Sequence, residues 1–381
     1  MQSFSLAPIP EIAFGNGLVL DLPKRVTDLA GKAAPVMIIA DPAMTALGIV
    51  AKLTKRLADA GHQASFYDGF KGEPKYSDID QAASRAREAG AKVVIGIGGG
   101  TALDTAKLVA SCAVSGKPVE AYQFCETALP SDPLALIAVP TTAGTGAEVI
   151  RTCIFTNAQG QKVWAWGSEL KPVLAVLDPE LTTGVPASVT AATGLDALVH
   201  AIEACTNRNR TEANDVYCHR AIALISGALE RAVKAPQDLD ARGELLLASC
   251  YAGIGIDNCG TALAHNISHA MAELAPVPHG RATGLAMMAT IGWTRDGNPS
   301  AFVKVARAMD GGEDVAMAYE NLVRRSGIKV SFAGDGLDLA RPELLAERMA
   351  SPAHAPMRKN TVREVGDGDL LMLAKCVYGL A

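Results

Sequence analysis

The sequence predicts an α/β domain with a parallel sheet, followed by an all-helical domain. In the first half, short apolar runs alternate with amphipathic stretches. Strands that alternate with helices are typical of a parallel sheet covered by helices on both faces. After Pro186, long segments rich in alanine and leucine follow one another at helical spacing. A chain of 381 residues, at roughly 100 to 200 residues per domain, is also long enough for two or three domains.

The individual elements follow from periodicity, because apolar runs of four to six residues indicate buried strands and one-sided apolar spacing indicates helices. The predicted strands are 36–40, 64–67, 92–97 and 134–139, and the predicted helices of the first half are 49–60, 79–89 and 103–114. In the second half, helices are predicted at 189–204, 215–233, 241–253 and 282–293, and the polar stretch 351–369 is expected to be loop. Proline and glycine cluster between residues 178 and 186. We therefore expect an α/β domain of residues 1–183 and a helical domain of residues 184–381.

Composition and charge exclude several classes of protein. Hydrophobic residues make up 49% of the chain and charged residues 20%, which is typical of a soluble globular enzyme. A net charge of −5 without a dense lysine and arginine cluster argues against a nucleic-acid partner. No apolar run approaches the roughly eighteen residues of a membrane span, and the first twenty residues do not resemble a secretory signal. Eight scattered cysteines without a Cys-x-x-Cys pair favour buried thiols in a reducing compartment, so we expect a cytoplasmic protein.

The distribution of histidine and aspartate suggests a metal site in the helical half. Three of the seven histidines, His265, His269 and His279, fall within fifteen residues, and Asp196 and His200 lie four residues apart. Residues at that spacing share one helix face. Imidazoles with one carboxylate suit a divalent first-row metal such as iron or zinc. The alternative is that these are hydrogen-bonded structural residues, but their apolar surroundings make unpaired polar groups costly and favour a shared ion.

A glycine-rich turn in the α/β half suggests a phosphate site. The apolar run 93–97 leads into Gly98 and Gly99 and then into a helix. Backbone N–H groups and the positive end of a helix dipole bind phosphate at such a turn. The dinucleotide fingerprint G-x-G-x-x-G is incomplete, because Thr101 stands at its third glycine position. By itself, the turn therefore predicts either a dinucleotide site or a tight strand-to-helix connection.

Two further segments favour a dinucleotide. Asp41 follows the apolar run 36–40, where a carboxylate accepts hydrogen bonds from ribose hydroxyls and repels a 2′-phosphate. This favours NAD over NADP, although an Asp-Pro pair is also an ordinary turn. The small-residue segment 140–146, Pro-Thr-Thr-Ala-Gly-Thr-Gly, follows another predicted strand and offers hydroxyls and backbone donors.

Four motifs together carry a resemblance to a known family. They are Gly-Gly-Gly-Thr-x-x-Asp-x-x-Lys at 98–107, the segment 140–146, Gly-Leu-Asp-Ala-Leu-Val-His at 194–200, and the three histidines followed by Gly280. In order and spacing they resemble the iron-containing (group III) alcohol dehydrogenases over nearly the whole chain. The resemblance implies a Rossmann-like N-terminal domain and an all-α C-terminal domain, the dehydroquinate synthase-like fold, with the active site in the cleft between them.

The resemblance also implies roles for individual residues. The metal ligands would be Asp196, His200, His265 and His279, and His269 would lie outside them, near the substrate, and relay a proton. The residues implied to bind the cofactor are Gly98, Gly99, Thr101, Asp104, Thr141, Thr142 and Lys162, in addition to Asp41. Ala147 replaces a serine that is usual in the family, and His269-Ala-Met-Ala272 replaces its common His-Pro-x-Gly. These differences lie around the implied substrate pocket, so they leave the substrate open.

The expected function is therefore a metal-dependent, NAD(P)-linked alcohol dehydrogenase or aldehyde or ketone reductase, with NAD favoured over NADP. Hydride would pass between the nicotinamide and a metal-bound alkoxide. We expect Fe²⁺, with Zn²⁺ or another divalent metal as alternatives, a small alcohol or aldehyde as substrate, and a homodimer. Three alternatives remain, namely a glycerol dehydrogenase, a maleylacetate reductase without a metal, and a protein that binds dinucleotide or metal without catalysis.

Overall fold

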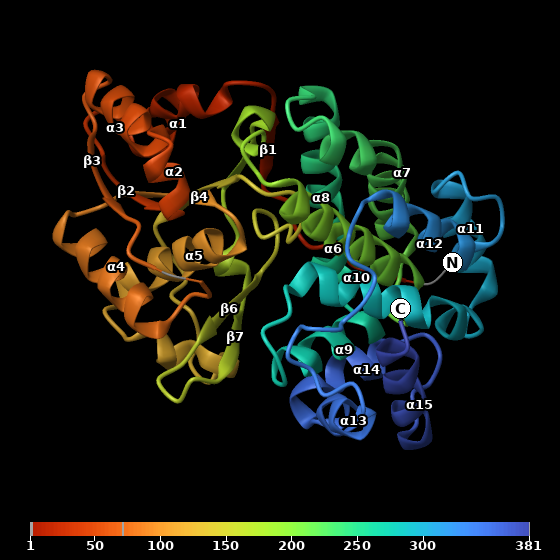
Figure 1. Cartoon of the computed structure of the whole chain (residues 1–381). Coiled ribbons are helices and arrows are strands. Elements are labelled where there is room, and N and C mark those ends of the chain that lie inside the picture. Colours follow the sequence, from red (N-terminus) through yellow and green to blue (C-terminus); the bar gives the residue numbers. More distant parts are fainter. Residues whose placement is uncertain (1–2, 71, 381) are drawn as a thin grey trace. The chain divides into compact units, whose positions relative to one another are not determined.

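The computed structural model describes residues 3–70 and 72–380, which form two compact units. The α/β unit consists of Pro8–Thr142 and Ala147–Thr182, drawn from red to yellow-green in Figure 1. The helical unit contains residues 183–380, together with residues 3–7 and the short segment Ala143–Gly146. The last segment belongs to the Pro140–Gly146 motif, so this one loop contributes residues to both units.

The α/β unit is built on a six-stranded parallel sheet. Its strand order is β1 (Glu11–Phe14), β8 (Leu174–Leu177), β5 (Ala135–Pro140), β4 (Val93–Gly98), β2 (Pro35–Ala40) and β3 (Gln63–Tyr67). Every neighbouring pair is parallel, with Val36 opposite Val93 and Val93 opposite Ala135 at the sheet centre. Because the central strands are buried on both faces, they are continuously apolar, which is why the sequence identified them.

Helices cover both faces of this sheet. Successive strand residues point to opposite faces, so Ile38 packs into one apolar cluster and Ile39 into another. The cluster of Ile38 includes residues of α1 (Leu22–Ala30) and α3 (Ile49–Asp59), and the cluster of Ile39 includes residues of α4 (Tyr76–Glu88) and α5 (Gly100–Ser115). A short helix α2 (Pro42–Ala46) follows β2. The predicted parallel sheet between two helical layers is confirmed.

An antiparallel hairpin in the same unit was not predicted. It pairs β6 (Thr152–Thr156) with β7 (Lys162–Trp166). Both strands alternate between buried and more exposed positions, with Cys153, Phe155, Val163 and Ala165 pointing inward. The unit also contains the 3₁₀ turns η1 (Leu18–Asp21), η2 (Val119–Cys125), η3 (Ser168–Leu170) and η4 (Pro179–Thr182).

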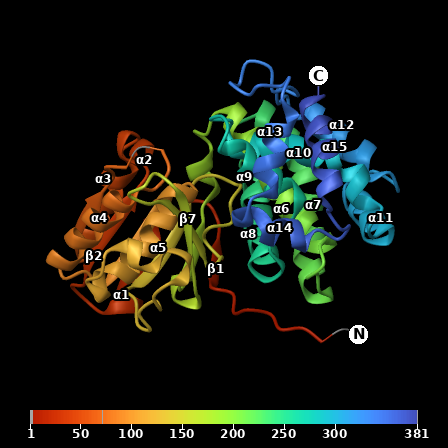
Figure 2. The same cartoon turned by 90° about the horizontal axis from the view of Figure 1, so that it is seen from below.

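The helical unit is built around one large apolar cluster. Its helices are α6 (Ala187–Thr206), α7 (Glu212–Lys234), α8 (Leu239–Cys259), α9 (Leu263–Ala272), α10 (His279–Arg295), α11 (Pro299–Ala308), α12 (Val315–Arg325), α13 (Pro342–Ala350), α14 (Ala355–Asn360) and α15 (Asp367–Tyr378). In Figure 2, α6 lies inside this unit and α11 lies at its margin. Nearly every residue of α6 after Thr193 is buried, so polar side chains on that helix must find partners inside the protein. The described part of this unit contains no strand, and no helix in the described chain is long and apolar enough to cross a membrane.

The expectation of a loop at 351–369 is wrong. This stretch contains the 3₁₀ turn η5 (Pro352–His354), helix α14 and the start of α15. Tertiary hydrogen bonds hold the end of α14 in place. Asn360 donates from Nδ2 to the carbonyl oxygens of Cys259 and Thr261. Such contacts depend on segments about one hundred residues away, so local polarity could not reveal them.

Candidate dinucleotide and metal sites

Three of the predicted dinucleotide residues, Asp41, Gly98 and Thr141, lie at the carboxyl ends of three adjacent strands. The backbone N–H of Asp41, after β2, donates to Ile97 O of β4 at 2.9 Å, and the N–H of Thr141, after β5, donates to Gly98 O at 2.9 Å. From β2 the chain continues outward to β3, and from β4 it continues in the other direction to β5. The strand order therefore reverses between β2 and β4, and ligands of such sheets bind at this point.

Close packing at the turn after β4 requires glycine. Gly98 has a φ of +152°, and a Cβ atom there would lie 2.6 Å from the Cβ of Ala102 and 2.8 Å from the Cβ of Asp41. Gly99 precedes the first residue of α5 and has no side chain to cap it, so the first N–H groups of the helix can face an anion. A Cβ at Gly99 would lie 3.3 Å from Thr142 Oγ1, which places that hydroxyl beside the turn.

Two predicted cofactor residues have protein partners. Asp104 Oδ2 accepts a hydrogen bond from Ile154 N at 3.0 Å, and its Oδ1 lies 3.5 Å from the Nζ of the buried Lys107. The Asp-x-x-Lys part of the motif thus links α5 to the β6–β7 hairpin. Burial raises the pKa of Asp104, and Lys107 counteracts this shift. Lys162 begins β7, where its Nζ pairs with Glu73 Oε1 at 2.6 Å. Direct contact of Asp104 or Lys162 with a cofactor stays a prediction.

Other predicted cofactor residues also have local hydrogen bonds. Asp41 Oδ1 accepts from Ala43 N at 2.8 Å and caps α2, as expected of an ordinary Asp-Pro turn. The backbone oxygen of Thr101, in the first turn of α5, accepts from Thr105 Oγ1 at 2.8 Å. These bonds use Oδ1 of Asp41 and the backbone oxygen of Thr101, and each residue has further polar atoms that could contact a dinucleotide. Dinucleotide binding by both residues stays a prediction.

Three of the predicted metal ligands converge in the helical unit. Ligand atoms of Asp196, His265 and His279 all lie within 4.8 Å of one another. Asp196 Oδ1 is 3.8 Å from His265 Nε2 and 3.6 Å from His279 Nε2. These residues come from α6, α9 and the first position of α10. Asp196 and His265 are buried, whereas 39% of the His279 side-chain surface is exposed. The group is therefore accessible from one side.

Two atoms in this group fit a cation. Within the described residues, the buried atoms Asp196 Oδ1 and His265 Nε2 have no hydrogen-bond partner. Buried polar groups are normally paired, and leaving two of them unpaired at one place is costly. Burial also lowers the pKa of His265 well below its usual value, so its imidazole is neutral, as a metal ligand must be. A divalent cation between these atoms would satisfy both of them.

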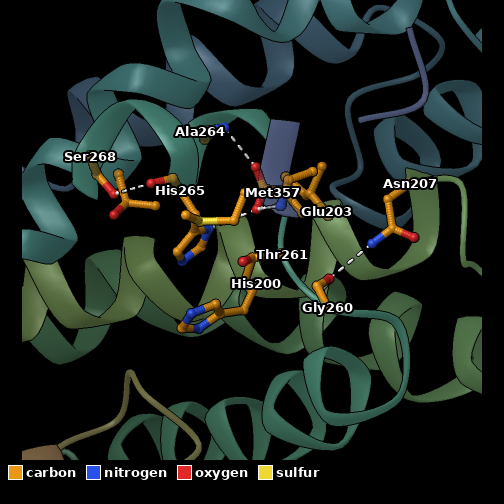
Figure 3. A network of polar contacts seen from close by, with 12 residues as sticks. His200, Glu203, Asn207, Gly260, Thr261, Ala264, His265, Ser268 and Met357 are labelled. Atoms are coloured by element: carbon orange, nitrogen blue, oxygen red, sulfur yellow. Dashed lines mark hydrogen bonds and ion pairs between the residues drawn. The ribbon is translucent and has the colours of Figure 1, made fainter. Parts of the chain in front are cut away.

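His200 lies beside this group, one helical turn after Asp196 on α6. Its imidazole stacks on that of His265 (Figure 3), and the two ring centroids are 4.5 Å apart. Its Nδ1 lies 3.2 Å from Gly144 O, so that nitrogen donates to the carbonyl and leaves Nε2 as the acceptor. His200 is not in the set of atoms within 4.8 Å, and its role as the fourth ligand stays a prediction.

His269 lies on α9 one turn after His265. Its ring centroid is 5.4 Å from that of His279 and 6.3 Å from that of His265. It is partly buried and stands outside the three-residue group. This position is compatible with the predicted role of His269, which is to contact the substrate rather than the metal. That role stays a prediction.

Glu203 is a member of this network that sequence reasoning missed. Its Oε2 lies 2.7 Å from His265 Nδ1 (Figure 3). Burial raises the pKa of Glu203 to about 7, although hydrogen bonds from the N–H groups of Ala262 and Ala264 counteract this shift. The available signal was spacing, because Asp196, His200 and Glu203 recur at positions i, i+4 and i+7 of one helix face.

Helices α10 and α6 pack so closely at Gly280 that there is no room for a side chain. A Cβ atom at Gly280 would lie 2.3 Å from Ala192 O and 3.2 Å from the Cβ of Asp196. We expect Gly280→Ala to push the start of α10 away from α6, which separates His279 from Asp196. Overpacking of this kind costs about 1–3 kcal/mol. The expected results are a lower thermal unfolding midpoint and at least ~10-fold weaker Zn²⁺ binding, measured by calorimetric titration; ~10-fold corresponds to 1.4 kcal/mol.

The matched control is Gly292→Ala on the same helix. Apart from its chain neighbours and the backbone of its own helix, a Cβ at Gly292 would have no described atom within 4 Å. Alanine there favours the helix by roughly 0.5–1 kcal/mol and should leave Zn²⁺ binding unchanged. Wild-type Zn²⁺ affinity in Gly280→Ala would contradict the packing argument.

Comparison with known proteins assigns the chain to a family. Residues 10–179 match the family model described as iron-containing alcohol dehydrogenase, and residues 190–370 match that of the C-terminal domain of the Fe-containing alcohol dehydrogenase family. The chain belongs to the iron-containing alcohol dehydrogenase family. The recognised family, the fold class and the expected class of enzyme, a metal-dependent alcohol oxidoreductase, are thereby confirmed.

Relatives within the family carry different names. The chain is 35% identical to a probable alcohol dehydrogenase, EutG, of Escherichia coli K12, over 77% of this chain and 75% of that protein. It is 28% identical to an NAD-dependent methanol dehydrogenase of Bacillus methanolicus, over 91% of this chain and 93% of that protein. Among solved structures, sulfoacetaldehyde reductase from Bifidobacterium kashiwanohense in complex with NAD⁺ is 26% identical, with a TM-score of 0.92 and 100% of both chains covered.

Proposed function

We propose that this protein oxidises a small alcohol, and reduces the corresponding aldehyde or ketone, with NAD and a divalent metal bound by Asp196, His200, His265 and His279. The observation that carries the proposal is the convergence of Asp196, His265 and His279, with two buried atoms of that group lacking a hydrogen-bond partner among the described residues. Iron is the metal that the family description favours, and zinc suits the same ligands.

The roles of the residues follow from their chemistry. A divalent cation held by these residues would supply positive charge that stabilises a deprotonated alcohol, and a bound nicotinamide would accept the hydride. Asp196 provides the negative charge of the site, and each neutral imidazole provides a nitrogen lone pair for the metal. The partial exposure of His279 leaves room for a substrate to approach. His269, whose ring lies beside that of His279, exchanges the proton of the substrate hydroxyl with solvent.

For the cofactor we propose NAD rather than NADP. Asp41 lies beside the glycine turn, where its carboxylate would accept hydrogen bonds from a ribose and repel a 2′-phosphate. The names of the methanol dehydrogenase and the sulfoacetaldehyde reductase complex support the same choice. We also propose a cytoplasmic homodimer. The scatter of the eight cysteines along the sequence, without a Cys-x-x-Cys pair, supports a reducing compartment.

The test is an NADH-formation assay with a panel of primary alcohols, diols and sulfonated alcohols, using protein stripped of metal and then supplied with Fe²⁺ or Zn²⁺. We expect turnover that depends on the added metal. His200→Ala should lose both metal and activity, whereas His269→Ala should keep the metal and turn over more slowly. Full activity of His200→Ala would contradict the ligand assignment. Turnover by metal-free protein would indicate the reductase class without a metal, and tight NADH binding without any turnover would indicate a binding protein.

A further inference from the structure

The carboxylate of Glu203 accepts three hydrogen bonds from one short segment of the chain. Its Oε1 accepts from Ala264 N at 2.7 Å, and its Oε2 accepts from Ala262 N at 2.6 Å and from His265 Nδ1 at 2.7 Å. Figure 3 shows the carboxylate of α6 facing this segment at the start of α9. A protonated carboxyl group would place its own hydrogen against one of these donors, so three donors at this distance fit the carboxylate form.

This arrangement replaces the usual cap of α9. The residue before the helix is Ala262, whose side chain cannot accept a hydrogen bond. Glu203 supplies the missing acceptor from another helix and places a negative charge at the positive end of α9. His265 lies in the first turn of α9, so one carboxylate fixes both the backbone that carries the imidazole and the imidazole itself.

The hydrogen bond to Nδ1 determines which nitrogen of His265 can bind a cation. Because Nδ1 donates to Glu203, the lone pair of the neutral ring is on Nε2. That nitrogen lies 3.8 Å from Asp196 Oδ1 and has no hydrogen-bond partner among the described residues. The other tautomer would place a hydrogen on Nε2 and exclude a metal ion from it.

We propose that Glu203 is a positioning residue of the metal site, which selects the Nδ1–H tautomer of His265 and aims Nε2 at the cation. The inference rests on the proposed metal-binding function and adds a determinant of metal affinity to it. Carboxylates that hold a ligating histidine in this way change metal affinity by about 10–100-fold.

The variant Glu203→Gln tests the charge and the acceptor pattern with almost the same volume. An amide has one oxygen, so its NH₂ group must face at least one of the three donors. If NH₂ faces His265 Nδ1, the ring must accept there and carry its hydrogen on Nε2. If NH₂ faces Ala264 N, two buried N–H groups oppose each other. Either orientation disturbs the first turn of α9.

The measurement is the Zn²⁺ dissociation constant of metal-free protein, obtained by competition with a chelating dye. Glu203→Gln should bind Zn²⁺ about 10–100-fold more weakly than wild type. The matched control is Asp314→Asn, because Asp314 Oδ1 also accepts two backbone N–H bonds, from Ala316 and Met317, at the start of α12. Both variants should lower the thermal unfolding midpoint, but only Glu203→Gln should weaken Zn²⁺ binding and alter the visible absorption spectrum of the Co²⁺-loaded protein.

The outcomes distinguish this inference from the function on which it rests. If Asp196→Ala binds Zn²⁺ as tightly as wild type, the proposed metal site itself is wrong. If Asp196→Ala loses Zn²⁺ while Glu203→Gln retains wild-type affinity, the site stands and the positioning role is overturned.

A second measurement does not depend on the folding of Glu203→Gln. Long-range ¹H–¹⁵N correlation spectra of metal-free wild-type protein report the tautomer of each imidazole, and the His265 signals are assigned by their loss in His265→Ala. We expect Nδ1 of His265 to carry the hydrogen. A hydrogen on Nε2 would overturn the proposal.

Discussion

Replacing His265 with alanine is expected to remove the metal and to lower kcat/KM for alcohol oxidation by at least about 10³-fold. A bound cation contributes several kcal/mol of charge stabilisation in the transition state, and about 4 kcal/mol corresponds to about 10³-fold in rate. His265 is central to the group, because it faces Asp196, stacks on His200 and is held by Glu203. Elemental analysis after gel filtration measures the metal, and steady-state NADH formation measures the rate.

The control for this substitution is His62→Ala in the α/β unit. His62 is also a buried histidine with hydrogen bonds, since its Nδ1 accepts from Ala34 N at 3.1 Å and its Nε2 lies 2.9 Å from Thr27 Oγ1. Its loss should lower thermal stability without changing the metal content. A His265→Ala protein that keeps a full complement of metal and near wild-type kcat/KM would show that the histidine cluster is structural.

Gly98→Ala is expected to weaken NADH binding by at least ~10-fold, or 1.4 kcal/mol, without removing the metal. The added methyl group would lie 2.6 Å from the Cβ of Ala102 and 2.8 Å from that of Asp41, and the φ of +152° is itself unfavourable for alanine. Relief of these contacts must move α5 or the residues after β2, which are the groups proposed to bind the dinucleotide. NADH fluorescence titration measures the effect.

The control is Gly116→Ala at the other end of α5. Gly116 also has a positive φ, +67°, but the nearest atom to its added Cβ would be the flexible Arg87 Nη1 at 3.7 Å. This variant should be less stable because of backbone strain and should bind NADH as wild type does. Unchanged NADH affinity in Gly98→Ala would refute the location of the dinucleotide site.

Elements with strong periodicity could be predicted from the sequence. The central strands β2, β4 and β5 are continuously apolar because helices cover both of their faces, and their expected positions agree with the structure to within one residue at either end. The hairpin of β6 and β7 was missed because each strand has only five residues, in which buried and more exposed positions alternate without a continuous apolar run. Helix α14 was missed because hydrogen bonds from Asn360 to a distant segment hold it.

The candidate site shows the same division between local and tertiary signals. Asp196, His265 and His279 stood out because histidine is scarce in this chain, and the structure brings these three together. Glu203 did not stand out, because glutamate is common in the chain. Its hydrogen bonds to Ala262, Ala264 and His265 form only once α9 is packed against α6. The buried bonds of Asp104 likewise depend on β6, which was not predicted. Residue type and spacing therefore identified the proposed ligands, whereas the groups that hold them in place could be identified only from the tertiary structure.

The most direct test of the metal site is anomalous X-ray diffraction at the absorption edge of iron or zinc, from crystals of protein loaded with that metal. We expect one strong peak per chain, about 2.0–2.2 Å from an oxygen of Asp196 and from Nε2 of His200, His265 and His279. A peak bonded to other residues, or a site from which Asp196 or His265 is absent, would contradict the proposed metal centre.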